Sequence, residues 1–118
     1  MNFSSYIEQV NGLANYSNVP QVPKDPYNIS VSLTEELLGY DKNITLNSAE
    51  QSAYNQAVNM STVHGPCCCR CWRWYAFEGQ AKYFIIHDAF NSSQIARIWN
   101  LEDGCGGPAD TPGYQPPA

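Results

Sequence analysis

The sequence feature that most constrains this chain is a cluster of cysteines and tryptophans near its middle. Four of the five cysteines and two of the three tryptophans lie within residues 67–74, which read Cys-Cys-Cys-Arg-Cys-Trp-Arg-Trp. The fifth cysteine, Cys105, lies in a second stretch that is rich in glycine, residues 104–107. Any fold of this chain has to accommodate five sulfur atoms, which can cross-link, bind a metal or exchange electrons.

The spacing of apolar side chains predicts an all-α fold. Aromatic and small residues recur at steps of three and four between Trp72 and Phe90, which predicts a long central helix over about residues 68–90. A partner helix over about residues 93–103 is expected to run antiparallel to it. Helical spacing also predicts shorter helices over residues 4–14, 32–40 and 48–62.

A β-hairpin is the alternative for the central segment. Residues 83–86, Tyr-Phe-Ile-Ile, favour a strand, and Glu78-Gly79-Gln80 can turn the chain back onto residues 72–77. Other strand candidates are few, namely residues 19–22 and 44–46. We therefore expect helices and keep the hairpin over residues 72–86 as the open alternative.

Two segments rich in proline define the expected domain organisation. Residues 18–30 contain Pro20, Pro23 and Pro26, which exclude a helix interior and predict an extended surface connector. Residues 106–118 hold four prolines and three glycines and form a C-terminal tail. We expect a single helical domain over residues 1–105, and a tail in which Tyr114 is placed to dock on a groove or on a neighbouring subunit.

Composition and charge exclude several classes of function. The chain has 118 residues and a net charge of −5, and its six lysines and arginines are scattered, so it has no basic face for nucleic acid. The same scatter argues against a polybasic membrane patch. No apolar run approaches the roughly 20 residues that a membrane-spanning helix needs. We expect neither nucleic acid binding nor a membrane span.

N-glycosylation motifs are more frequent than the composition predicts. The pattern Asn-x-Ser/Thr occurs six times among 11 asparagines and 14 serines and threonines. Chance predicts about one such acceptor pattern. This excess predicts an extracellular or cell-surface glycoprotein, although residues 1–5 lack the basic and apolar regions of a signal peptide. The six acceptors are Asn2, Asn15, Asn28, Asn43, Asn59 and Asn91.

Helix geometry predicts that Cys105 meets the cysteine cluster. Gly65 and Pro66 place the cluster at or just before the start of the central helix, where the helix dipole stabilises a thiolate. On a helix, Cys71 would share a face with Cys67 and with Cys68. Because an antiparallel partner helix returns to the start of the first helix, Cys105 is expected to close this end of the pair.

Three chemistries fit this closure. A soft-metal site would take Zn or Cu, and less readily an iron–sulfur cluster, from a sulfur-rich ligand set to which the His64 imidazole is a candidate addition. A disulfide staple between Cys105 and Cys67 or Cys68 would pin the helix ends and leave one odd cysteine. Thiol redox chemistry is a minor alternative, since residues 68–71 read Cys-x-x-Cys at a helix start. The cysteines available to all three are Cys67, Cys68, Cys69, Cys71 and Cys105.

These observations predict a structural or assembly subunit, of a cell surface or a filament, clasped by disulfides at the cysteine cluster. We expect no catalytic residues and no cofactor, and the expected partners are further copies of the chain, another surface protein and N-linked glycans. The alternative is a soft-metal-binding protein that holds Zn or Cu with the same cysteines. Aromatic residues available for an interface are Trp72, Trp74, Trp99 and Tyr114.

Overall fold

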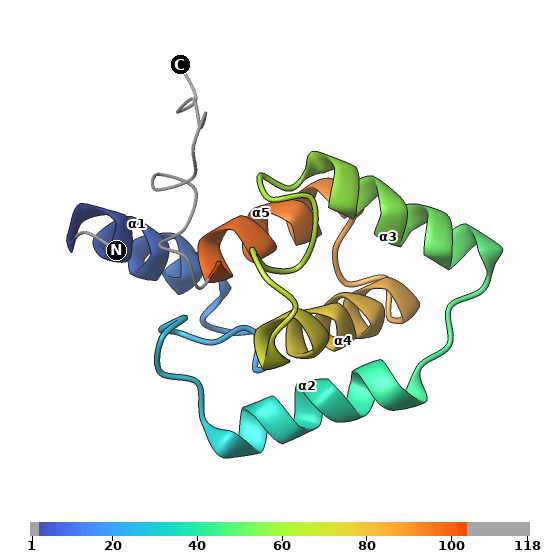
Figure 1. Cartoon of the computed structure of the whole chain (residues 1–118), viewed down its shortest axis with the longest axis horizontal. Coiled ribbons are helices and arrows are strands. Elements are labelled where there is room, and N and C mark those ends of the chain that lie inside the picture. The colour runs from blue at the N-terminus through green and yellow to red at the C-terminus, as the bar shows by residue number, and fades with distance from the viewer. Residues whose placement is uncertain (1–2, 104–118) are drawn as a thin grey trace.

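Five α-helices and no strand make up residues 3–103, the part of the chain that this computed structural model describes (Figure 1). The all-α prediction is therefore confirmed, and residues 72–86 form a helix and not a hairpin. The expected boundary between residues 105 and 106 lies outside the described residues. The helices are α1 (Phe3–Leu13), α2 (Val31–Asn43), α3 (Ser48–Met60), α4 (Trp72–Ile86) and α5 (Ser92–Glu102), with a 3-10 turn η1 (Ala14–Tyr16) after α1.

Side-chain caps fix where three of the helices begin. The Asn47 and Asn91 side chains each accept a hydrogen bond from the backbone three residues on, and Glu50 and Gln94 return one, so α3 and α5 both begin with a capping box. Ser30 caps α2 by accepting from the Leu33 N–H at 3.1 Å. Each cap satisfies backbone donors that the first helical turn leaves without a partner.

Three predicted helix ends are wrong. The helix expected over residues 32–40 passes Gly39 and continues to Asn43, because a glycine only weakens a helix whose other contacts are good. The central helix begins at Trp72 and not near residue 68, since the Cys71 backbone is extended, with φ −91° and ψ −169°. It ends at Ile86 and not near residue 90, and Asp88, just beyond this end, has a positive φ of 53°. Residues 67–71 are therefore a loop, and their cysteines do not share a helix face.

The helices pack in two groups around a common core. α2 lies beside α4 over its length, and α5 lies between α1 and α3 (Figure 1). The two groups meet where the Trp99 indole N–H of α5 donates to the Phe77 carbonyl of α4 at 3.1 Å. The core members on these two helices and on α2 and α3 are almost wholly buried: Leu37, Ala57, Phe77, Ala81, Phe84, Ile95, Ile98 and Trp99.

The connector of residues 18–30 contains no helix and runs across the molecule, as its prolines predict. It is tied to α4 by side chains that reach its backbone. The Gln80 amide donates to the Gln21 carbonyl at 2.8 Å, and the Arg73 guanidinium donates to the Pro26 carbonyl. The connector therefore serves as a packed layer over α4.

The closest approach of α2 and α4 depends on Gly79. A Cβ atom at this position would lie 2.0 Å from the Leu37 carbonyl oxygen and 2.7 Å from the Asp41 nitrogen. Both of these are backbone atoms, so no side-chain movement can make room. Gly39, on α2, has open space around the corresponding point.

We predict that Gly79→Ala forces α2 and α4 apart and lowers the free energy of unfolding by about 2–4 kcal/mol, as overpacking against backbone does. The matched variant Gly39→Ala should raise it by about 0.5–1 kcal/mol, because alanine is the better helix former. Denaturant midpoints of the two variants and the wild type measure both effects. Equal stability of the two variants would contradict the packing described here.

Candidate functional site

The cysteine loop, residues 61–71, connects α3 to α4 and is held in a compact shape by its own first residues. The Ser61 hydroxyl is buried, accepts from the Gly65 N–H at 2.8 Å and donates to the Val58 carbonyl at 2.9 Å. Gly65 packs against the Trp74 ring, so closely that a Cβ there would lie 2.4 Å from it. These contacts fix the backbone of the loop just before Cys67, the first of its cysteines.

Cys67, Cys68 and Asp103 form the one group of three metal-ligating side chains found among residues 3–103. One sulfur or carboxylate oxygen from each lies within 4.8 Å of the others. Cys67 and Asp103 are buried and Cys68 is exposed. The Cys67 thiol donates to the Asp103 carboxylate, with 3.9 Å between Sγ and Oδ1. The end of α5 therefore lies against the cysteine loop, while Cys105 itself lies outside the described residues.

Polar contacts with α1 and the connector hold the end of α5 in this place. The buried Gln9 amide donates to the carbonyls of Leu101 and Asp103, both at 2.9 Å. The Tyr27 hydroxyl in turn donates to the Gln9 amide oxygen at 2.8 Å. Because the last carbonyls of a helix have no partner within it, Gln9 acts as a C-terminal cap supplied from another helix.

A buried acid lies next to Asp103. The Glu102 side chain is fully buried and accepts from the Gln80 amide at 2.6 Å. Its second oxygen, Oε1, has no hydrogen-bond partner. Burial raises the pKa of Glu102 well above its ordinary value, and the Gln80 amide and the Arg73 charge offset only part of this. Glu102 therefore keeps its proton at pH values at which an exposed glutamate is already ionised.

Cys69 and Cys71 do not belong to the donor group of Cys67, Cys68 and Asp103, and they interact with each other. A hydrogen-bonding interaction with Cys71 is the largest cause that raises the pKa of the exposed Cys69 thiol. Burial alone would raise the pKa of Cys71, but the N–H groups of Arg73 and Trp74 and the Cys69 thiol favour the thiolate and lower it overall. The Cys71 side chain makes no capping hydrogen bond. The N–H groups at the start of α4 therefore favour its thiolate through the helix dipole.

The structure separates the other predicted site residues. His64 is exposed, with φ 55°, and does not belong to the donor group of Cys67, Cys68 and Asp103. Trp99 is 1% exposed, so its predicted role in an interface is wrong, because its ring fills the core. Trp72 is 45% exposed, and the Arg70 guanidinium lies 4.8 Å above the half-buried Trp74 ring. Tyr114 lies outside the described residues.

Five of the six glycosylation acceptors lie within the described residues, and all five are exposed: Asn15, Asn28, Asn43, Asn59 and Asn91. Asn2 lies outside them. The Asn91 side chain uses its oxygen to cap α5, which leaves the amide nitrogen for a glycan. Asparagines outside the motifs, such as Asn11 and Asn55, are exposed as well. Exposure therefore satisfies a condition for glycosylation without distinguishing the motif.

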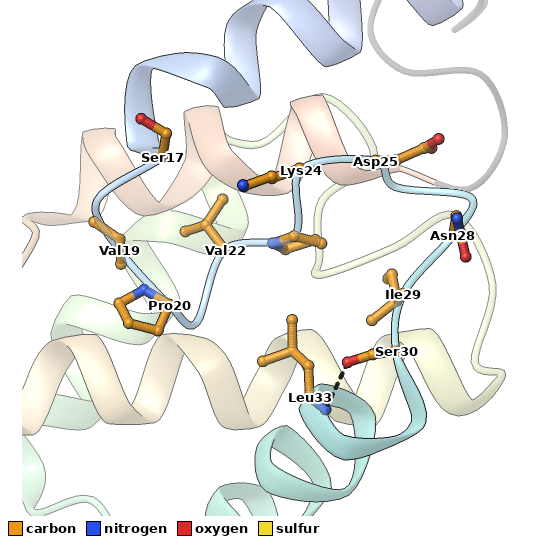
Figure 2. Close-up of a pocket in the computed structure, with 11 residues that line it drawn as sticks. Ser17, Val19, Pro20, Val22, Lys24, Asp25, Asn28, Ile29, Ser30 and Leu33 are labelled. Atoms are coloured by element: carbon orange, nitrogen blue, oxygen red, sulfur yellow. Dashed lines mark hydrogen bonds between the residues drawn. The ribbon is translucent and has the colours of Figure 1, made fainter.

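The connector also encloses a cavity of about 380 Å³, which the sequence did not indicate. Figure 2 shows Val22, Ile29 and Leu33 among the apolar side chains that line it, and Lys24 and Asn28 among the polar ones. Val19, Pro20 and Pro23 add to the apolar part of the lining. The cavity holds no group of three metal-ligating side chains, so it is not a second site of the kind found at the cysteine loop.

A second polar cluster joins α2, α3 and α4. The Tyr54 hydroxyl donates to Glu78 at 3.0 Å, and the Lys82 ammonium lies 3.2 Å from the Asp41 carboxylate. Burial and then a hydrogen bond with Asp41 raise the pKa of Glu78. Leu46 lines a cavity of about 240 Å³ next to this cluster. The cluster brings two carboxylates and one ammonium together where α2, α3 and α4 meet, which is the arrangement of a structural junction between helices.

Sequence reasoning missed the buried residues that hold this site. Gln9, Gln80 and Glu102 are each buried polar side chains on the apolar face of a helix. A polar residue at an apolar position of a helical pattern was their only signal. Its partner in each case is distant in the sequence, for example 92 residues away for Gln9 and Leu101, so the pattern could not identify it.

No helix among the described residues is long and apolar enough to cross a membrane. Comparison with protein families, with curated proteins and with solved structures finds no significant match to this chain.

We predict that the buried acid gives the fold a dependence on pH. Since folding raises the pKa of Glu102, its contribution is fully present below the pKa of an unfolded glutamate, about 4.3, and is lost as the pH rises through the folded value. Glu102→Gln, which mimics the protonated acid, should therefore be more stable than the wild type at pH 8 and equal to it near pH 4. Urea midpoints at the two pH values measure this.

Glu35→Gln serves as the control, because Glu35 is exposed on α2, and a surface substitution of this kind should change the midpoint little at either pH. A lower midpoint for Glu102→Gln than for the wild type at pH 8 would show that the ionised acid stabilises the fold, which contradicts the prediction.

Proposed function

We propose that this chain is a structural or assembly subunit that acts outside the cytoplasm, and that a disulfide between Cys68 and Cys105 clasps its fold. The observation that carries the proposal is the position of Asp103, whose carboxylate lies within 4.8 Å of the sulfur atoms of Cys67 and Cys68. Asp103 precedes Cys105 by two residues. The chain that carries Cys105 therefore leaves α5 next to the cysteine loop.

Burial distinguishes the two candidate partners of Cys105. The Cys67 thiol is 1% exposed and engages the Asp103 carboxylate. Cys68 is exposed beside it, so a sulfur atom arriving from outside the core reaches Cys68 without displacing the Asp103 contact. Cys105 follows Asp103 by two residues, and two residues of extended chain span at most about 7 Å. The Cα atoms of a disulfide lie about 4.4–6.8 Å apart, so this reach is of the right size for a bond to Cys68.

The clasp would contribute stability mainly through the unfolded chain. Closing the loop between residues 68 and 105 removes about 3–4 kcal/mol of chain entropy in the usual model. For a domain of this size the total free energy of unfolding is about 5–15 kcal/mol. A single bond at this position would therefore account for a large part of the stability in an oxidising compartment.

The glycosylation motifs support the compartment. Their six occurrences exceed the roughly one expected by chance, and the five described acceptors are all accessible. A disulfide persists in the same oxidising compartments in which such motifs are used. The excess of motifs therefore supports the compartment that the proposed clasp requires.

An exposed aromatic patch on α4 supports assembly. Trp72 and Tyr75 lie three residues apart on one helix face and are 45% and 43% exposed. Val31, at the start of α2, is 74% exposed, and α2 and α4 begin at the same end of their pair (Figure 1). Large exposed aromatic side chains are enriched at protein interfaces, so this end of the pair is the proposed contact surface.

The second candidate function is soft-metal binding, which the donor group itself favours. Two sulfur ligands and a carboxylate from Cys67, Cys68 and Asp103 form a set that Zn accepts when the cysteines are reduced. This function and the disulfide use the same sulfur atoms, so they exclude each other at Cys68.

We predict that peptide mapping without reduction finds Cys68 linked to Cys105 in protein from an oxidising compartment. Cys68→Ser and Cys105→Ser should each lose about 3 kcal/mol of unfolding free energy, and the double variant should lose no more, because both substitutions remove one bond. Denaturant unfolding with and without a reductant measures this. Under the reductant, the variants and the wild type should differ by less than about 1 kcal/mol.

Elemental analysis decides between the two candidates. Stoichiometric zinc or copper together with five alkylatable cysteines would overturn the clasp and favour the metal site. For the compartment, intact mass and glycosidase treatment of native material test the five accessible acceptors, and unmodified asparagines would remove the argument for export.

We predict that the chain associates through the aromatic patch. Sedimentation over a wide concentration range should show oligomers that Trp72→Ala combined with Tyr75→Ala weakens at least about tenfold, the effect of losing one interface hot spot. Trp99 cannot serve as the control, because it is buried in the core and its replacement would disturb the fold. The matched control is Met60→Ala, at an exposed position of α3. A wild type that stays monomeric throughout would contradict the assembly function.

A further inference from the structure

The walls of the cavity along the connector are held in place by contacts within the fold. Its volume is about 380 Å³, which is within the roughly 300–1,000 Å³ of small-molecule sites. The Val22 N–H donates to the Val19 carbonyl at 3.1 Å, and the Asn28 N–H donates to the Asp25 carbonyl at 3.2 Å, so two turns shape the connector here. Because the fold itself fixes these walls, a ligand that binds between them loses little conformational entropy in ordering the site.

More than half of the residues that line the cavity are aliphatic: Val19, Pro20, Val22, Pro23, Ile29 and Leu33. Proline adds carbon surface without an N–H donor, and no residue of the described lining is aromatic. The wall therefore offers carbon atoms and few hydrogen bonds. An alkyl chain is the group that gains most from such a wall, because its burial removes apolar area from water on both sides.

Two charged residues of opposite sign also line the cavity, and only the cation is free. The Asp25 carboxylate accepts from the Tyr6 hydroxyl at 2.7 Å and from the Tyr27 N–H at 2.9 Å. The Lys24 ammonium makes no hydrogen bond or ion pair with the described part of the chain. Figure 2 shows these two charged side chains pointing in opposite directions along the connector, with Lys24 directed toward Val22. An uncompensated positive charge therefore lies beside an aliphatic wall.

We propose that this cavity binds a small aliphatic carboxylate, with its alkyl chain against the aliphatic wall and its carboxylate at the Lys24 ammonium. A monocarboxylate fits better than a dicarboxylate, because a second negative group would meet the Asp25 carboxylate at the same cavity. This binding activity goes beyond a structural role, and it depends neither on the clasp nor on glycosylation.

The alkyl chain supplies most of the affinity, and the charge supplies the selectivity. Each methylene group that leaves water raises the affinity by up to about fourfold. Lys24 is exposed, so its ion pair with the ligand is worth no more than about fivefold in affinity. The two contributions can therefore be measured separately, by changing the chain and by changing the charge.

Octanoate is the probe, added to the full chain produced without glycosylation, so that Asn28 at the cavity carries no sugar. Methyl NMR spectra should show saturable shifts of the Val22 and Leu33 methyl groups. The methyl groups of Ile7 and Ile86 should not shift. Both are 39% exposed, and they lie on other helices, so they separate binding in the cavity from contact with any exposed aliphatic side chain.

A charge variant with three probes isolates the ion pair. Lys24→Met keeps an apolar side chain at an exposed position, so it should leave the fold intact. It should lower the affinity for octanoate about threefold to fivefold, leave the affinity for octanol unchanged and raise the affinity for octylammonium. Lys42→Met, at an exposed position near the end of α2 and outside the cavity lining, is the matched control and should change none of the three.

A shorter probe and an isosteric variant test the wall. Hexanoate, which has two methylene groups fewer, should bind about tenfold more weakly than octanoate. Val19→Thr keeps the shape of a half-buried side chain and adds a hydroxyl group to the wall. It should therefore weaken octanoate and octanol by the same factor, at least about twofold. Circular dichroism of every variant checks the fold.

Three results would overturn the inference: no saturable shift at Val22 and Leu33, equal shifts at Ile7 and Ile86, or a loss of octanol affinity in Lys24→Met as large as its loss of octanoate affinity. Shifts of the cavity methyl groups that follow protein concentration without any probe would assign the cavity to a second copy of the chain, and would overturn it as well. The assay involves no cysteine, so its outcome is independent of the clasp.

Discussion

The two hydrogen bonds from Gln9 to the end of α5 are the contacts on which the arrangement of the site depends. Gln9 is separated from Leu101 by 92 positions in the chain and from Asp103 by 94. These bonds therefore form only when α1 has packed on α5. They supply donors to two carbonyls at the end of α5, and a buried carbonyl that lacks a donor costs about 1–3 kcal/mol. The same contacts set Asp103 against the cysteine loop, and the candidate chemistry follows from that position.

The helices could be predicted from the sequence because their signals are local. Residues 48–60 carry an apolar stripe behind a capping pattern, and residues 92–102 repeat the combination. The start of α4 could not be placed in this way. The pattern of three and four continues back towards Cys68, and only the tertiary contacts of Gly65 with Trp74, and the extended backbone at Cys71, end it at Trp72.

The candidate site was predictable in its broad geometry and not in its members. An antiparallel return of α5 was sufficient to expect the end of that helix near the cysteines. Asp103 was not identified, because a solvated acid at a helix end and a buried one have the same sequence. The division of the cysteines also escaped prediction. It follows from which side chains the loop turns inwards, and adjacent identical residues carry no signal of that.

The buried acid at the end of α5 has a consequence for folding as a reaction. Burial raises the pKa of Glu102 in the folded chain, whereas an unfolded glutamate ionises near pH 4.3, roughly. Between these two pKa values folding is accompanied by proton uptake at this position, and hydrogen ions enter the folding equilibrium as a ligand of the native state. In an unbuffered solution within that pH range, the chain would make its surroundings slightly more alkaline as it folds.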